Sequence, residues 1–234
     1  MSTGPRAGTL EEPQVRAMFD RIAGVYDVMN SVMTAGMHHR WRARAADLAL
    51  PIPPAPGDEV LDVATGTGDL AVELSSRGAN VIATDFSEVM LEHARAKQPA
   101  ITWEWANAQD LPYESNRFAA ATVGFGARNF SDLSLGISEM TRVVKPGGRV
   151  VILEITTPQK PPLSTFFSVW FDHIVPGLGR LAGDPDAYTY LPNSVKRFPG
   201  PEGLAALMDG AGLRDIRWIL TAGGIIAIHV GTKA

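Results

Sequence analysis

A glycine-rich turn constrains the fold of this chain more than any other feature. The turn lies within residues 60–71, which read VLDVATGTGDLA. The apolar run before it predicts a strand, and the residues from Asp69 onward predict a helix. Such a turn offers backbone N–H groups and the positive end of a helix dipole to a ligand that lies across it. We therefore expect Gly66, Thr67 and Gly68 to bind a cofactor.

Two acidic residues are expected near the turn at the same edge of the sheet. Asp62 lies in the strand before the turn, and Asp85 ends the next apolar run, VIATD. An acid at the tip of the second strand binds the ribose diol in nucleotide-binding α/β folds. We therefore expect Asp62 and Asp85 to contribute to a site for an adenosine-containing cofactor.

The composition narrows the classes of protein to which the chain can belong. Its 234 residues, 45% of them hydrophobic, suit one α/β domain. The formal net charge of −4 gives no electrostatic reason to expect nucleic acid as a partner. Cysteine is absent, which excludes disulfides, a thiolate nucleophile and cysteine-ligated metals. The polar N-terminus does not read as a signal peptide, and no uninterrupted apolar run approaches the roughly 18 residues of a membrane span. We expect a cytoplasmic protein.

Strand patterns alternate with helical patterns after residue 58. We predict strands at residues 59–63, 80–84, 101–105, 118–124 and 149–155. We predict helices at residues 69–77, 87–97, 132–145 and 201–211, with Ser87 and Asp132 as N-caps. The end of the chain predicts a hairpin that turns at residues 222–224. The alternation is typical of a doubly wound α/β fold, here a mostly parallel seven-stranded sheet with an antiparallel C-terminal strand.

The remaining segments lie outside that alternation. Residues 1–10 are polar, and we expect them to be disordered. Residues 11–50 predict a helical appendage, which the Pro-rich residues 51–56 connect stiffly to the sheet. Residues 157–200 are rich in Pro, Phe and Gly and predict an inserted cap over the strand tips. We expect residues 11–234 to form a single domain.

The turn by itself does not identify the cofactor. Residues 66–71 match the G-x-G-x-x-G/A fingerprint of dinucleotide-binding proteins, and a plain strand–helix turn is the structural alternative. Asp62 is unfavourable beside a diphosphate but suits the ammonium group of a methionine moiety. The Asn107 side chain and the Ala108 N–H, after the third strand, can bind an adenine edge, and Asn107 can equally be an ordinary loop residue. These features favour S-adenosylmethionine, with NAD as the alternative.

The order of elements resembles that of class I S-adenosylmethionine-dependent methyltransferases, of which a terminal hairpin is the mark. Several motifs further resemble the C-methyltransferases of ubiquinone and menaquinone biosynthesis. These motifs are YDVMN at 26–30 with His38 and Trp41, Ala64 in the first glycine position, FGARN at 125–129, RVVKPGGRVVILE at 142–154, DAYTYL at 186–191, and LTAG at 220–223 with His229. The resemblance covers about residues 12–234.

The resemblance implies a Rossmann-like enzyme that transfers a methyl group from S-adenosylmethionine to a ring carbon of a polyprenylated quinol, without a metal. Demethylmenaquinol is the expected acceptor, and a benzoquinol precursor of ubiquinone is the alternative. An NAD-dependent reductase and a non-catalytic cofactor-binding scaffold are the alternatives from other classes. We expect peripheral contact with the inner face of the cell membrane and leave a homodimer open.

Three positions depart from the pattern of that family. Thr34 and Thr156 replace serines and keep a hydroxyl group. Gly124 replaces a serine that contacts the cofactor in many members, so that contact is not expected here.

Methylation of a quinol ring carbon requires a nucleophile. The carbon becomes nucleophilic when the adjacent hydroxyl loses its proton, but a phenol pKa of about 10 is too high at neutral pH. A neighbouring cation favours the phenolate. Arg128 is the candidate for that cation, with a surface salt bridge as its alternative role, and Asn129 is the candidate for orienting the hydroxyl or a water. The candidate acceptors of the ring-carbon proton, each with a structural alternative, are His173, Tyr188, Tyr190 and His229.

Two further groups of residues have both a functional and a structural interpretation. Asp27, His38 and Trp41 either close the N-terminal helices over the cofactor or pack and cap those helices. The aromatic residues of segment 166–171 either contact a prenyl chain or membrane surface or belong to the core. His38 and His39 are adjacent and diverge on a helix, so they predict no metal site.

Overall fold

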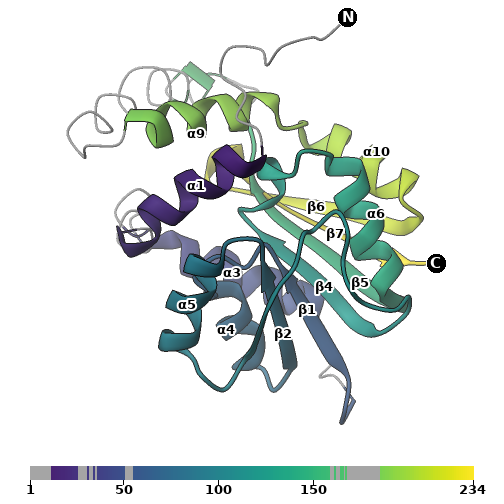
Figure 1. The fold of residues 1–234 in the computed structure, drawn as a ribbon. Coiled ribbons are helices and arrows are strands. Elements are labelled where there is room, and N and C mark those ends of the chain that lie inside the picture. Colours follow the sequence, from purple (N-terminus) through teal and green to yellow (C-terminus); the bar gives the residue numbers. More distant parts are fainter. Residues whose placement is uncertain are drawn as a thin grey trace, which may run out of the picture.

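A seven-stranded sheet is the framework of the computed structural model (Figure 1). The structure describes residues 12–25, 31, 34, 36–50, 55–158, 161, 164, 165, 167 and 185–234. The sheet has the strand order β3-β2-β1-β4-β5-β7-β6. Its strands are β1 (Glu59–Val63), β2 (Asn80–Asp85), β3 (Thr102–Trp105), β4 (Phe118–Gly124), β5 (Val144–Ile155), β6 (Leu213–Thr221) and β7 (Ile226–Lys233).

The sheet is parallel except for β7, which is antiparallel to both of its neighbours, β5 and β6. This confirms the predicted arrangement. The central strand β1 pairs with β2 on one side, where Val60 lies opposite Val81, and with β4 on the other, where Val60 lies opposite Ala120. Both faces of β1 are buried, which explains its continuous apolar run.

Helices cover both faces of the sheet (Figure 1). One face, which includes Val60, packs against α3 (Met37–Ala49), α4 (Asp69–Ser75) and α5 (Glu88–Lys97). The other face, which includes Leu61, packs against α6 (Leu133–Val143) and α10 (Pro201–Gly210). The α3 helix buries Trp41 and a run of alanine and leucine side chains in the first of these cores. The predicted N-terminal helical segment therefore contributes to the core of the sheet.

The first helix, α1 (Glu12–Ile22), lies in the segment predicted to be helical, and the 3₁₀ turn η1 (Ala23–Val25) follows it. Val15 and Met18 are buried on the inner face of α1. The Ser87 hydroxyl, at the start of α5, donates a hydrogen bond of 2.5 Å to Oδ1 of Asp20. This contact holds α1 next to the end of β2, and therefore beside the predicted cofactor site.

Both predicted N-caps are confirmed. The Ser87 hydroxyl accepts a hydrogen bond from the Met90 N–H at 3.1 Å, and Asp132 Oδ1 accepts one from the Leu135 N–H at 2.9 Å. Each side chain satisfies a backbone donor that the first turn of a helix leaves without a partner. Helices α5 and α6 therefore begin where the sequence indicates.

The transition from α6 to β5 differs from the prediction. The helix ends at Val143, and β5 begins at Val144 instead of residue 149. Val144 has extended dihedral angles and pairs with Phe118, after which the register shifts until Arg149 pairs with Ala120. The physical reason is Pro146, which disfavours a helical residue before it and cannot donate a hydrogen bond. The Pro-Gly-Gly sequence thus makes an irregularity inside the strand.

The terminal hairpin turns at η4 (Ala222–Gly224), as predicted. Its first strand begins at Leu213, before the apolar run that starts at Ile216, and an irregularity between Arg214 and Arg217 interrupts its register. Asp215 adopts a φ of 52° at this point. The predicted helix at 201–211 corresponds to α10.

The predicted cap is described in part. Helix α9 (Pro185–Arg197) lies over the end of the sheet and contacts the 3₁₀ turn η2 (Ala127–Asn129) (Figure 1). Phe167 is buried against Val195, Ile155 and Ile225, so this one aromatic residue belongs to the core. Phe166, Trp170 and Phe171 lie outside the described residues. Within the described ranges, no helix has the length and apolar character needed to cross a membrane.

We expect Gly68→Ala to destabilise the fold more than Gly78→Ala does. Both glycines have a positive φ, 87° and 82°, so each alanine incurs a left-handed backbone cost of about 1–2 kcal/mol. A Cβ at Gly68 would lie 2.3 Å from Cη2 of Trp103, whereas a Cβ at Gly78 meets no described heavy atom within 4 Å. The clash adds about 1–3 kcal/mol for Gly68→Ala. Urea unfolding of both variants measures the difference, and equal losses would contradict the prediction.

Candidate active site

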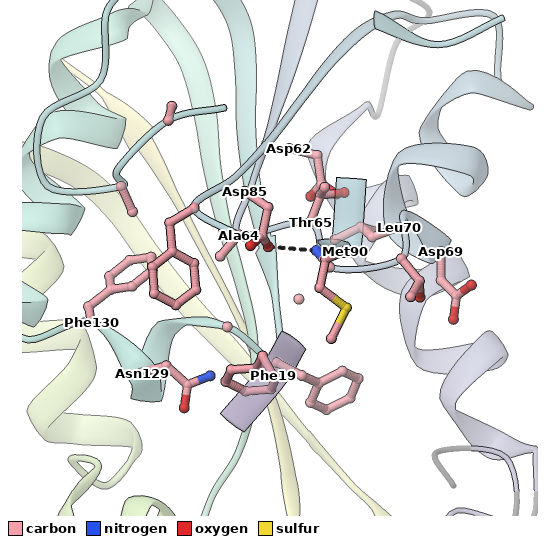
Figure 2. Close-up of a pocket in the computed structure, with 18 of the residues that line it drawn as sticks. Phe19, Asp62, Ala64, Thr65, Asp69, Leu70, Asp85, Met90, Asn129 and Phe130 are labelled. Carbon is pink, nitrogen blue, oxygen red and sulfur yellow. Dashed lines mark hydrogen bonds between the residues drawn. The ribbon is translucent and has the colours of Figure 1, made fainter. Parts of the chain in front are cut away.

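A cavity opens at the carboxyl end of the parallel strands, where β1, β2 and β4 end (Figure 2). It encloses about 860 Å³, including the part open to solvent. The strand order reverses between β1 and β4, so the chain leaves these two strands in opposite directions. Ligands of open α/β sheets bind in the crevice that this reversal leaves. The cavity also receives side chains from helices α1 and α3, namely Phe19 and Arg42.

Asp85 connects the tip of β2 to the glycine turn. Its Oδ2 accepts a hydrogen bond from the Gly66 N–H at 2.8 Å, drawn as a dashed line in Figure 2, and its Oδ1 accepts one from the Ser87 N–H at 2.9 Å. Burial raises the pKa of this carboxyl to about 6, although the backbone N–H groups of Ser87, Gly66 and Phe86 oppose the increase. Two of the predicted site residues, Asp85 and Gly66, are therefore in direct contact.

Asp62 is buried at the base of the cavity. Its carboxylate accepts hydrogen bonds from the hydroxyl of Thr122 at 2.6 Å and from that of Thr65 at 2.5 Å. Burial raises the pKa of Asp62 to about 6, and the two hydroxyls and the charge of Arg42 oppose this change. Asp62 thus joins the β1 turn to strand β4 and lines the cavity as well.

The tips of β1 and β4 approach each other closely. Ala64 and Phe125 both have a positive φ, 50° and 63°, which is a left-handed conformation that side chains rarely adopt. A Cβ on Gly126 would lie 2.7 Å from the Cβ of Ala64, so only glycine fits at residue 126. All three residues line the cavity. Backbone strain of this kind is concentrated at functional sites, which supports the choice of this cavity.

Most of the predicted cofactor-binding residues line this one cavity. They are Asp62, Gly66, Thr67, Asp85, Asn107 and Ala108. Asn107 Oδ1 accepts a hydrogen bond from the Gln109 N–H at 2.9 Å, which fixes the loop after β3. Gly68 does not line the cavity, because it starts α4 and packs against Trp103. Gly124 does, and a Cβ there would come within 3.1 Å of Leu70 Cδ2.

Arg128 and Asn129 are placed differently, although they are adjacent in η2. Asn129 lines the cavity, whereas Arg128 is outside the lining. Nη1 of Arg128 forms a buried ion pair of 2.7 Å with Oε1 of Glu154 and donates to the Phe125 carbonyl at 2.5 Å. The salt bridge considered for Arg128 is therefore present, but it is buried and not at the surface.

Tyr190 extends from α9 to the same turn. Its hydroxyl donates a hydrogen bond of 3.1 Å to Oδ1 of Asn129. Burial raises the pKa of Tyr190, which keeps the phenol neutral, while the charge of Arg128 opposes the increase. Among the other candidate proton acceptors, His229 is buried in β7, stacks on Trp218 and does not line the cavity. The positions of His173 and of the Tyr188 side chain lie outside the described residues.

Of the N-terminal residues, some line the cavity and others do not. His38 and Trp41 are buried in α3 but do not line the cavity, and Asp27 lies outside the described residues. Arg42, which belongs to none of the motifs named above, also lines the cavity. It follows His38 by four residues, so helical spacing placed it on the same face. The apolar lining residues Phe86 and Met90 follow Asp85 closely in sequence, whereas no sequence signal indicated Phe19.

The sheet order and the switch-point cavity define a class I methyltransferase fold. A SAM-dependent methyltransferase of Thermotoga maritima, described as a possible histamine N-methyltransferase, shares this fold with a TM-score of 0.62 and 19% identity, over 93% of this chain and 99% of that one. The [4+2]-cyclase SpnF shares it with a TM-score of 0.66 and 18% identity, over 100% of this chain and 98% of that one. These likenesses confirm the predicted fold class.

The sequence narrows this class further. The model of the ubiE/COQ5 methyltransferase family matches residues 8–233. A demethylmenaquinone methyltransferase of Thermus thermophilus is 44% identical over 223 residues, covering 92% of this chain and all of that protein. The chain therefore belongs to the ubiE/COQ5 methyltransferase family, and it is a methyltransferase.

The buried carboxyl of Asp62 gives a test of the site's electrostatics without a ligand. The folded chain keeps this proton up to about pH 6, whereas the unfolded chain, with an ordinary pKa of 3.8, has already released it. The contribution of this proton to the unfolding free energy is fully present at low pH and is lost as the pH rises through about 6. Relative to Asp62→Asn, the wild type should lose at most about 3 kcal/mol of unfolding free energy between pH 4 and pH 7.

Asp58→Asn is the control for this measurement. The hydrogen bond from Lys145 lowers the pKa of Asp58 in the folded state. The unfolding free energy of the wild type, relative to that of Asp58→Asn, should therefore increase as the pH rises. Chemical unfolding across the pH range measures both differences. Parallel pH profiles for the wild type and Asp62→Asn would show that burial does not perturb Asp62.

Proposed function

We propose that this chain transfers a methyl group from S-adenosylmethionine to a ring carbon of demethylmenaquinol, which leaves S-adenosylhomocysteine and releases the proton of that ring carbon. The observation that carries the proposal is one cavity at the switch point that contains buried Asp62 and Asp85 together with Asn129. The first two residues suit the cofactor, and the third suits a hydroxyl of the acceptor. The similarity to a relative named demethylmenaquinone methyltransferase supports the choice of acceptor.

The residues of the cavity fit the cofactor by their chemistry. Asp85 would accept hydrogen bonds from a ribose diol, and Asp62 would bind the ammonium group of the methionine part. Asn107 and Ala108 would bind the adenine edge between apolar side chains that include Phe86 and Met90. Gly66 and Thr67 would border the ligand at the turn. When bound, S-adenosylmethionine supplies a methyl group on a sulfonium, which is a good leaving group.

The enzyme's own contribution is to favour the phenolate form of the quinol. Oδ1 of Asn129 accepts from Tyr190, and in Figure 2 the amide nitrogen of Asn129 lies on the side of this residue that faces Phe19. This nitrogen is therefore the group that can donate to a quinol oxygen as its negative charge develops. Arg128 adds positive charge behind Asn129, although Glu154 offsets much of it. We assign Tyr190, which is neutral, to orienting Asn129.

Asn129→Ala tests this assignment. Loss of a donor to a developing oxyanion typically costs about 10²- to 10³-fold in kcat, and we expect a loss in that range. The affinity for S-adenosylmethionine should change by less than about threefold, because Asn129 contacts the acceptor. Asn80→Ala, an exposed position at the opposite end of β2, is the matched control. A normal kcat for Asn129→Ala would remove this residue from the mechanism.

Cofactor affinity should depend on pH through Asp62 and Asp85. Each must be ionised to bind the ligand, and each has a pKa of about 6. The affinity should therefore fall roughly tenfold for each carboxylate between pH 7 and pH 5. Asp85→Asn should weaken binding at least about tenfold at pH 7 and remove its share of the pH dependence. Calorimetry at several pH values measures both effects, and an unaltered affinity for Asp85→Asn would exclude Asp85 from the site.

The acceptor is tested by a methyl-labelled assay in detergent. Naphthoquinol and benzoquinol acceptors are compared side by side, and we expect label in the naphthoquinol. Label in the benzoquinol alone would favour the ubiquinone precursor, and label in neither would support a cofactor-binding scaffold. NADH binding in place of S-adenosylmethionine would support a reductase. A polyprenylated acceptor also implies that the protein visits the membrane surface from the cytoplasm, and liposome co-sedimentation tests that part of the proposal.

A further inference from the structure

Arg42 is the cationic residue of a cavity that otherwise carries acidic groups. Among the described lining residues, it is the one lysine or arginine, and the carboxylates are Asp62, Asp69 and Asp85. Its side chain is 7% exposed. Placing a guanidinium out of water is costly unless it has anionic partners, so its position in the cavity calls for an explanation.

The contacts of Arg42 hold its guanidinium without using all of its donors. Nη1 lies 3.4 Å from Oδ2 of Asp69 and also contacts Nδ1 of His38. Cζ lies 5.3 Å from the centre of the Phe125 ring, close enough for a cation–π interaction. Among the described residues, the polar contacts of Arg42 all use Nη1. The side chain is therefore fixed by three neighbours while Nε and Nη2 can donate to a ligand.

Asp69 does not neutralise Arg42 by itself. Nζ of Lys97 lies 2.6 Å from Oδ1 of Asp69, so one carboxylate is shared by two cations. Arg42 also interacts electrostatically with Asp62, because its charge opposes the increase in the pKa of Asp62. The same end of the cavity thus presents a positive group whose partner carboxylate is shared with Lys97, and a buried negative group. A ligand with a carboxylate next to an ammonium group complements this pair.

We propose that Arg42 binds the α-carboxylate of S-adenosylmethionine, while Asp62 binds the neighbouring ammonium group. This rests on the proposed function, because it deepens the assignment of the cofactor site. The Arg42 guanidinium is held over the Phe125 ring and is a planar fork whose donors suit the two oxygens of a carboxylate. Helix α3, which belongs to the N-terminal segment, thereby completes a site that the sheet alone leaves without a cation.

The test compares two ligands that differ only in the carboxylate. The probes are S-adenosylmethionine and decarboxylated S-adenosylmethionine, and calorimetry measures their affinities for the wild type and for Arg42→Gln. We expect Arg42→Gln to weaken S-adenosylmethionine at least about tenfold, since a charge-assisted hydrogen bond is lost. The affinity for the decarboxylated ligand should remain within about threefold or increase, because that ligand is more positive and the variant has lost a positive charge.

Two variants complete the design. Arg44→Gln removes an exposed arginine from the same helix and should leave both affinities unchanged. Arg42→Lys keeps the charge without the planar fork and should retain an intermediate preference for the carboxylate. Thermal unfolding of each variant shows whether it is folded.

The possible outcomes separate this proposal from the proposed function. Equal weakening of both ligands by Arg42→Gln would overturn the proposal, because Arg42 would then be structural. Unchanged affinities would overturn it as well. If the wild type binds S-adenosylmethionine through Arg42 but methylates no quinol, the proposed acceptor fails and the assignment of Arg42 is retained. If the wild type does not bind S-adenosylmethionine, both proposals fail.

Discussion

The hydrogen bond from the Gly66 N–H to the Asp85 carboxylate is the interaction on which the rest of the site depends. It joins the turn after β1 to the tip of β2, and it does so with a carboxylate that is almost fully buried. Asp62 makes the equivalent connection from β1 to β4 through the Thr122 hydroxyl. Three strand tips are thus held together by two acids, and the cavity is the space that they leave. An acid that both braces the fold and faces the cavity cannot be replaced by an apolar residue without loss of one role.

Burial of these acids has an energetic consequence that links stability to binding. Each carboxyl has its pKa raised to about 6, so ionisation inside the folded chain is unfavourable compared with ionisation in water. A ligand that presents an ammonium group or a diol compensates for that cost only when it is bound. If Asp62 and Asp85 bind the cofactor as we propose, part of the binding free energy comes from compensating these two buried acids.

The sequence predicted the sheet and the turn well because local patterns determine them. The apolar runs, the caps Ser87 and Asp132 and the final hairpin each depend on residues that are close in sequence. The cavity-lining residues that follow the ends of strands were predicted. Those that reach the cavity from helices α1 and α3 were not. Arg42 reaches the cavity from a helix 20 residues before Asp62, and its pairing with Asp69 depends on how α3 packs on α4. Arg128 was selected by its motif, yet its ion pair with Glu154 arises from the pairing of β4 with β5.

The fold alone does not determine the reaction. The [4+2]-cyclase SpnF has the same architecture as this chain, and so does a methyltransferase described as a possible histamine N-methyltransferase. The residues that contact the acceptor must therefore come from elements outside the shared sheet. In this chain the hydrogen bond from Tyr190 to Asn129 ties α9 to the turn after β4, which is where a methyl acceptor would approach the cofactor. We therefore propose that the strand tips and α3 bind the cofactor, whereas selection of the acceptor depends on how α9 holds Asn129.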